Sequence, residues 1–147
     1  MIATAQHTWI RRVAYAVLGS YWAVMFISTH VPSPPDAVML HASDKVLHFS
    51  AYAVLAFLLS LIIARGWALN WRVAAGVLAI IGTYGVLDEL TQIPVGRHCD
   101  WRDWLADVAG GMFGIALYAI GQRLWGRRAA ELPKALEADS AATSDSA

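Results

Sequence analysis

Four long apolar stretches dominate this chain, at residues 13–31, 46–64, 73–90 and 104–122. Each approaches the roughly 20 residues that an α-helix needs to cross the hydrocarbon core of a bilayer. They are separated by "VPSPPD", the short basic "RGWALNWR" and "IPVGRHCD", whose prolines and glycines interrupt helices. The sequence therefore predicts an all-α integral membrane bundle of four transmembrane helices.

The low charge content supports this interpretation. Charged residues make up 15% of the chain and hydrophobic residues 58%, whereas soluble domains carry about 25% charged residues. The formal net charge is +0, so no excess charge would recruit nucleic acid. Cys99 is the only cysteine, which excludes an intrachain disulfide.

The predicted organisation has three parts: an N-terminal segment 1–12, a membrane domain 13–128 and a tail 129–147. The first apolar stretch lacks an A-x-A-like cleavage site, which predicts a retained anchor rather than a signal peptide. The tail is rich in Ala, Ser and Asp and is predicted to be disordered.

Basic residues near the span ends predict the orientation, because they are enriched on the cytoplasmic side. Seven fall on one side and three on the other: Arg11, Arg12, Arg65, Arg72, Arg123, Arg127 and Arg128 against Lys45, Arg97 and Arg102. Both termini and the tail are therefore expected in the cytoplasm. Most tryptophans fall at span ends, where amphipathic rings prefer to lie.

Polar side chains recur at helical spacing at the outer ends of three predicted spans. The three faces are Asp44, His48 and Tyr52; Tyr84, Asp88 and Gln92; and Asp100, Asp103, Asp107, Gly110 and Gly114. A carboxylate facing lipid is costly, so these acids are expected to face a shared outward-opening pocket. Lys45 and Arg97 are the expected counter-charges. His30 has no supporting pattern and is expected at the interface.

Structural roles are alternatives for some of these residues. Asp44, Asp100 and Asp103 are suitable N-terminal helix caps. Asp88 and Glu89 end their own helix, where the dipole disfavours acids, so capping is not expected for them. Their structural alternative is a buried ion pair with Arg97.

Three segments resemble the conserved blocks of the VanZ-like family. They are "DKVLHFSAY", "YGVLDELTQ" and "GRHCDWRDWLADVAGGMFG", which together span roughly residues 44–118. The family consists of small helical membrane proteins, named for an accessory protein associated with teicoplanin resistance. The resemblance implies a role in the cell envelope. Asp107 is a departure, since many members have Asn there, and a metal, a neighbouring arginine or a proton is expected to compensate its charge.

The predicted ligand-binding set combines the polar residues of all three blocks: Asp44, Lys45, His48, Tyr52, Tyr84, Asp88, Glu89, Gln92, Arg97, Asp103 and Asp107. Candidate catalytic residues are Asp88, Glu89 and His48. Several carboxylates and a histidine would suit a divalent cation such as Mg²⁺, Mn²⁺ or Ca²⁺. The candidate metal ligands are Asp88, Glu89, Asp103 and Asp107.

The leading hypothesis is an accessory protein of the bacterial inner membrane that recognises an envelope lipid or a lipid-linked cell-wall precursor. An enzyme acting on a lipid-linked phosphate or an envelope lipid, with or without a metal, is an alternative, although no nucleophile motif supports it. A proton-coupled transport component is a third hypothesis. Gly110 and Gly114 offer a small-residue helix face through which a homo-oligomer would form.

Overall fold

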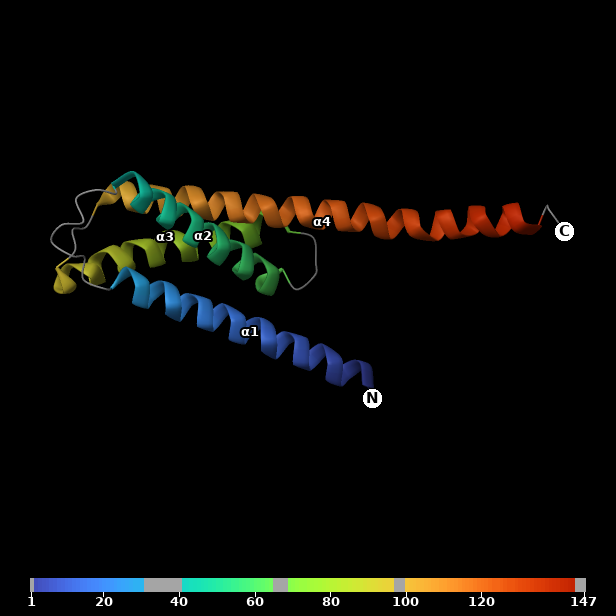
Figure 1. Cartoon of the computed structure of the whole chain (residues 1–147), viewed down its shortest axis with the longest axis horizontal. Helices are drawn as coiled ribbons and strands as arrows, with labels where there is room; N and C mark the ends of the chain where they lie inside the picture. Colours follow the sequence, from blue (N-terminus) through green and yellow to red (C-terminus); the bar gives the residue numbers. More distant parts are fainter. Residues whose placement is uncertain (1, 31–40, 65–68, 97–99, 145–147) are drawn as a thin grey trace.

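The computed structural model describes residues 2–30, 41–64, 69–96 and 100–144, which are almost entirely helical (Figure 1). The elements in chain order are α1 (Ile2–Thr29), α2 (His41–Ile63), α3 (Trp71–Gln92), the short 3-10 helix η1 (Ile93–Val95) and α4 (Trp101–Ser144). The described ranges contain no strand. The prediction of an all-α fold is confirmed.

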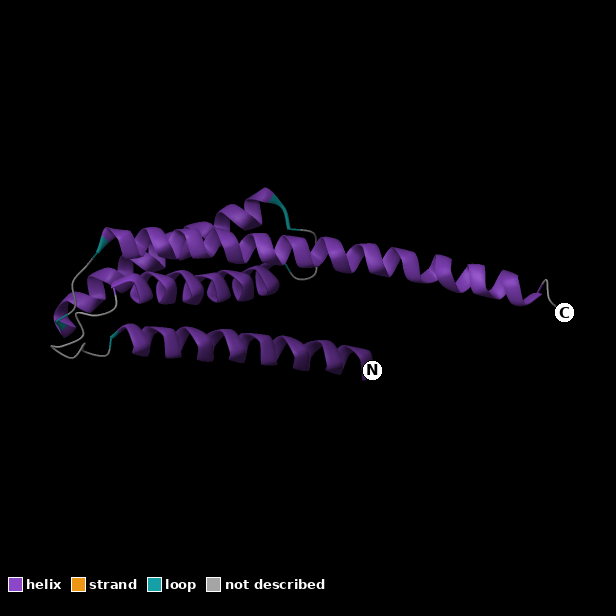
Figure 2. Cartoon of the chain, turned by 45° about the horizontal axis from the view of Figure 1, so that its top comes forward, coloured by secondary structure: helices purple, strands orange, loops and turns teal. Residues whose placement is uncertain are grey.

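The helices run up and down, so that the polar ends of several helices meet. The end of α1, the start of α2, the end of α3 and the start of α4 lie toward one end of the molecule (Figure 1). α1 lies along one side of the other helices, and α4 continues well beyond them (Figures 1 and 2). This arrangement places the predicted polar faces at the same end of the bundle.

Three helices are long and apolar enough to cross a membrane within the described residues: Asp44–Ile63, Trp71–Val95 and Trp101–Trp125. α1 is a helix, as predicted, but is not among these three. The segment from Gly19 to Trp22 contains glycine, serine, tyrosine and tryptophan, which dilute its apolar character. A fourth crossing by α1 and the cytoplasmic position of the termini remain predictions.

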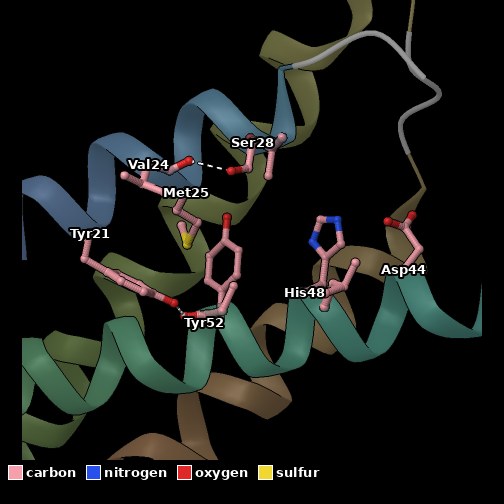
Figure 3. Close-up of a pocket in the computed structure, with 10 residues that line it drawn as sticks. Tyr21, Val24, Met25, Ser28, Asp44, His48 and Tyr52 are labelled. Carbon is pink, nitrogen blue, oxygen red and sulfur yellow. Dashed lines mark hydrogen bonds between the residues drawn. The ribbon is translucent and has the colours of Figure 1, made fainter. Parts of the chain in front are cut away.

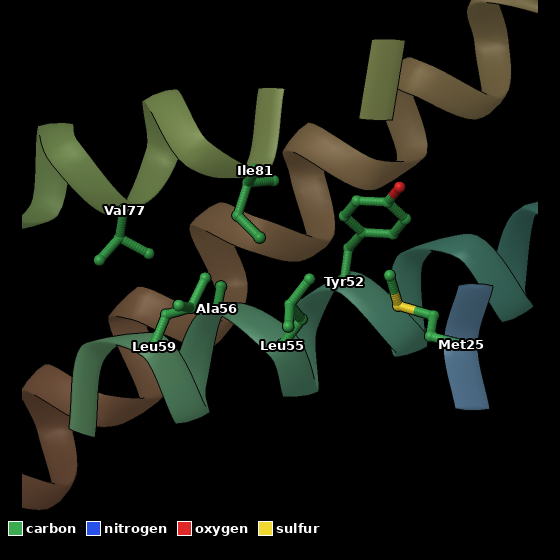
Figure 4. Packing of buried hydrophobic residues seen from close by; sticks show 7 residues of the cluster. All are labelled: Met25, Tyr52, Leu55, Ala56, Leu59, Val77 and Ile81. Atoms are coloured by element: carbon green, nitrogen blue, oxygen red, sulfur yellow. The ribbon is translucent and has the colours of Figure 1, made fainter. Parts of the chain in front are cut away.

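The hydrophobic core lies between α2, α3 and the C-terminal part of α1. Its buried members are Met25, Tyr52, Leu55, Ala56, Leu59, Val77 and Ile81 (Figure 4). Large apolar side chains also cover the outside of the bundle, where Leu47, Leu61, Leu87, Phe113 and Leu117 are exposed. A surface of this kind suits acyl chains, because lipid does not penalise exposed apolar side chains as water does.

Two glycines of α4 allow it to approach α2 closely. A Cβ atom at Gly110 would overlap the backbone carbonyl of Phe49, and one at Gly114 would overlap that of Ala53. Small residues at such positions let helix backbones touch. The expected homo-oligomer face is therefore occupied by α2 of the same chain, which corrects its assignment to contacts between copies.

The structure also differs from the prediction at the C-terminal tail. Helix α4 continues to Ser144 and so includes most of the segment 129–147, which is predicted to be disordered. Ala, Leu and Glu recur in "AAELPKALEA" and are strong helix formers. Composition predicts that this segment lacks a core of its own, which does not exclude a single helix.

Candidate functional site

The site is built from two pairs of polar residues. The two members of each pair lie one helical turn apart on the same helix. Asp44 and His48 project from α2, and Asp103 and Asp107 from α4. His48, Asp103 and Asp107 are buried. Since Gly110 lies against Phe49, the glycine contact holds the two pairs at close range. The structure thus brings together four residues of the predicted ligand-binding set.

His48 and Asp107 form a buried pair across the two helices. The Nδ1 atom of His48 lies 2.8 Å from Oδ1 of Asp107, and Asp107 is 0% exposed. The other carboxylate oxygen of Asp107 has no hydrogen-bond partner among the described residues. A metal, an arginine or a proton is the compensation predicted for the charge of Asp107, and the structure places a histidine beside it.

Lys45 is a counter-charge, as predicted, and it joins α2 to the start of α4. Its Nζ atom donates to Oδ1 of Asp103 at 2.7 Å and to Oδ2 of Asp100 at 3.3 Å. Asp100 lies just outside the candidate spans. The backbone N–H of Arg102 and the Lys45 ammonium hold the pKa of the Asp100 carboxyl below its usual range.

Asp88 anchors α1 to α3. Its carboxylate accepts from the Thr29 hydroxyl at 2.9 Å and from the Gln92 amide at 3.1 Å. His30 lies 4.0 Å from the same carboxylate and makes a 3.0 Å hydrogen bond with Thr91. Asp88 and Gln92, which are predicted to share one face of their helix, are hydrogen-bonded to each other. Thr29 and His30 are not among the residues predicted for the site, although both end the first apolar stretch at the level of the other polar residues.

Glu89 caps a helix, although not its own. The side chain is 3% exposed, and its Oε2 accepts the backbone N–H of Asp100 at 2.9 Å, at the start of α4. The expectation that capping does not apply to Glu89 is therefore wrong. A carboxylate at the end of one helix satisfies an orphan N–H at the beginning of the next.

The substitution Glu89→Ala is expected to lower the free energy of unfolding by about 0.5 to 2 kcal/mol, the usual effect of losing an N-terminal cap. Glu89→Gln keeps an acceptor oxygen and is the matched control, with a smaller loss expected. Thermal unfolding in detergent measures both. Equal losses in the two variants would contradict the capping role.

A cavity of about 310 Å³ opens between α1 and α2 (Figure 3). Asp44, His48 and Tyr52 line it from α2, and apolar and hydroxyl side chains complete its wall: Tyr21, Val24, Met25, Ser28, Thr29, Leu47 and Ala51. Tyr52 is 1% exposed, and its hydroxyl group has no hydrogen-bond partner within the described part of the chain. The Tyr84 hydroxyl is likewise buried without such a partner, and the two tyrosine rings lie 5.8 Å apart between their centroids.

The predicted metal ligands are not brought together. Among the described residues, the one group with suitable geometry is Asp44, His48 and Asp103, whose ligand atoms all lie within 4.8 Å of one another. Asp103 alone is shared with the predicted set. Asp88, Glu89 and Asp107 bind Thr29, the Asp100 backbone and His48 instead. Arg97, the other predicted counter-charge, lies outside the described residues.

The sequence matches a known protein family. The model of the family described as VanZ/LLP1 matches residues 5–122. The match includes all of α2 and α3 and every residue of the site described above. No curated protein and no solved structure gives a match.

Proposed function

Because the chain belongs to the VanZ/LLP1 family, we propose that it is an accessory membrane protein that binds an envelope lipid or a lipid-linked cell-wall precursor. Its place would be the bacterial cytoplasmic membrane, with the cavity opening toward the outer leaflet. The same proposal links the protein to resistance against glycopeptide antibiotics.

The observation that carries this proposal is the composition of the cavity wall. Polar groups of α2 form one side, while Val24, Met25 and Leu47 contribute apolar surface beside them. Binding sites for amphipathic ligands commonly combine an apolar wall with a few convergent polar groups. A lipid would place its headgroup against His48 and Tyr52, and its acyl chains along the exposed apolar surface outside.

The Tyr52 hydroxyl supports a bound polar ligand. A buried hydroxyl without a partner costs about 1 to 3 kcal/mol relative to one that is hydrogen-bonded. A phosphate or carboxylate oxygen in the cavity would accept its hydrogen bond. Arg97 would add a cation to the same headgroup, as the sequence predicts.

Tyr52→Phe is expected to fold as well as the wild type and to retain envelope lipid roughly 10-fold less. The substitution removes a single hydroxyl, and a hydrogen bond to a charged group contributes about 1.5 to 3 kcal/mol. Native mass spectrometry of the purified proteins measures the lipid that copurifies with the variant and with the wild type.

The matched control for this experiment is Tyr118→Phe. The Tyr118 hydroxyl accepts from Gln122 at 2.9 Å, and Tyr118 does not line the cavity. Lipid retention is expected to be unchanged in this variant. Equal retention by the Tyr52→Phe variant and the wild type would count against the proposal, as would a wild type that prefers no envelope lipid over bulk phospholipid.

The His48–Asp107 pair favours an enzyme as the second candidate. A buried carboxylate that orients a histidine is a common arrangement for general acid–base catalysis. The reaction would act on a lipid-linked phosphate in the same cavity. Turnover of labelled envelope lipid should then depend on His48, and turnover that persists in the His48→Ala variant would remove this candidate.

A further inference from the structure

Asp44, His48 and Asp103 point three ligand atoms at a common space. The two residues of α2 are one turn apart, and Asp103 approaches from α4. Two atoms that bind one ion at about 2.0 to 2.2 Å are separated by at most about 4.4 Å. Since the three atoms lie within 4.8 Å of one another, a closure of a few tenths of an ångström would complete the site.

We propose that Asp44, His48 and Asp103 bind a divalent cation and that Asp107 orients the histidine ligand. The hydrogen bond between Nδ1 of His48 and Asp107 leaves Nε2 as the ring nitrogen that carries the ion. A carboxylate behind a coordinating histidine fixes the ring and raises its basicity. Orienting the histidine ligand would account for the burial of the Asp107 carboxylate, which has a single hydrogen-bond partner among the described residues.

The chemistry of the side chains around the site suits a cation. Asp44, His48 and Asp103 supply two carboxylates and an imidazole, which are common ligands of divalent cations. Lys45 donates to Asp103 and to Asp100 at the edge of the site.

A separate observation indicates that this space receives a ligand. The Tyr52 hydroxyl, which is buried and has no partner among the described residues, points into the cavity that Asp44 and His48 also line (Figure 3). A cation held by three protein ligands keeps coordination positions open, and here they would face this cavity. An anionic oxygen could bind the ion and accept from Tyr52. This last consequence rests on the proposed function, whereas metal binding itself does not.

The ligand set indicates which ions are suitable. One imidazole nitrogen with two carboxylate oxygens suits Zn²⁺ or Mn²⁺, whereas Ca²⁺ and Mg²⁺ prefer oxygen ligands alone. The nitrogen ligand also provides a direct measurement. In protein loaded with Mn²⁺, electron spin echo spectroscopy should detect coupling to the ¹⁴N nucleus of a coordinated histidine.

The experiment uses the full chain in detergent, treated with a chelator and titrated with Zn²⁺ and with Mn²⁺ in a calorimeter. The wild type is expected to bind one ion per chain. Asp44→Asn should weaken binding at least 10-fold without unfolding the protein, because Asp44 is half-buried at the start of α2. Asp107→Asn should weaken it roughly 10- to 100-fold, the usual effect of removing the partner of a coordinating histidine.

Ser60→Ala is the matched control, because it removes a buried polar group of the same helix whose hydroxyl donates to the Ala56 carbonyl, away from the site. Its metal affinity should equal that of the wild type. The proposal fails if bound Mn²⁺ shows no nitrogen coupling, if Asp44→Asn binds as tightly as the wild type, or if Ser60→Ala loses binding as much as Asp44→Asn does. Since no lipid enters these measurements, a protein that binds metal but retains no envelope lipid would refute the proposed function alone.

Discussion

Replacing Gly110 with alanine is expected to lower the free energy of unfolding by about 3 kcal/mol or more. Overpacking a well-packed contact typically costs about 1 to 3 kcal/mol, and here the obstacle is backbone. The new Cβ would meet the carbonyl group of Phe49. A backbone carbonyl cannot rotate away like a flexible side chain, so α2 and α4 must separate. Unfolding of the purified protein in detergent, by heat or by SDS titration, measures the loss.

Gly121→Ala is the matched control on the same helix. A Cβ at Gly121 meets nothing within 4 Å, and alanine is the better helix former by roughly 1 kcal/mol. We expect this variant to be as stable as the wild type or slightly more stable. Equal losses at Gly110 and Gly121 would mean that the close contact between α2 and α4 does not hold the bundle together.

The Gly110→Ala substitution also tests whether the geometry of the site depends on the close contact between α2 and α4. His48 lies one residue before Phe49, and Asp107 lies less than one turn before Gly110. Separation of the helices at Gly110 would therefore lengthen the 2.8 Å contact between His48 and Asp107. Any Gly110→Ala protein that remains folded is expected to lose metal affinity as well.

The helices and their polar faces could be predicted because both depend on local sequence. A period of three to four residues assigns Asp44, His48 and Tyr52 to one face of a helix before any partner is known. His48 and Tyr52 are buried and Asp44 lines the cavity, as that face requires. The seam of Asp103, Asp107 and Gly110 is likewise buried.

The partners across helices could not be predicted in the same way. Periodicity gives the face of one helix but not its rotation or height relative to a neighbour. The sequence therefore did not indicate that the Glu89 side chain accepts a hydrogen bond from the Asp100 backbone. It also did not indicate that the Asp88 carboxylate accepts one from Thr29 of α1. The sequence pattern of a small-residue helix face is the same whether the face packs against another chain or against another helix of the same chain. Gly110 and Gly114 are an example of the second case.

Removing His48 is expected to destabilise the protein more than removing the charge of Asp107. His48→Leu leaves a buried carboxylate without its histidine, and breaking a buried pair in this way costs about 3 to 5 kcal/mol. Asp107→Asn leaves a neutral histidine beside an amide that can still form a hydrogen bond. Interhelical hydrogen bonds in membranes contribute about 0.6 kcal/mol on average, so a loss of about 1 kcal/mol is expected. Thermal unfolding in detergent compares the two variants.

The double variant His48→Leu/Asp107→Asn separates the cost of an unpaired charge from the value of the contact itself. If the carboxylate causes the loss in His48→Leu, then adding Asp107→Asn should recover most of the lost stability, because no charge remains buried. The recovered protein should still fail to bind the divalent cation, since it lacks the histidine ligand. Strictly additive losses would show that the two residues do not interact in the folded protein, and the orienting role of Asp107 would then have to be abandoned.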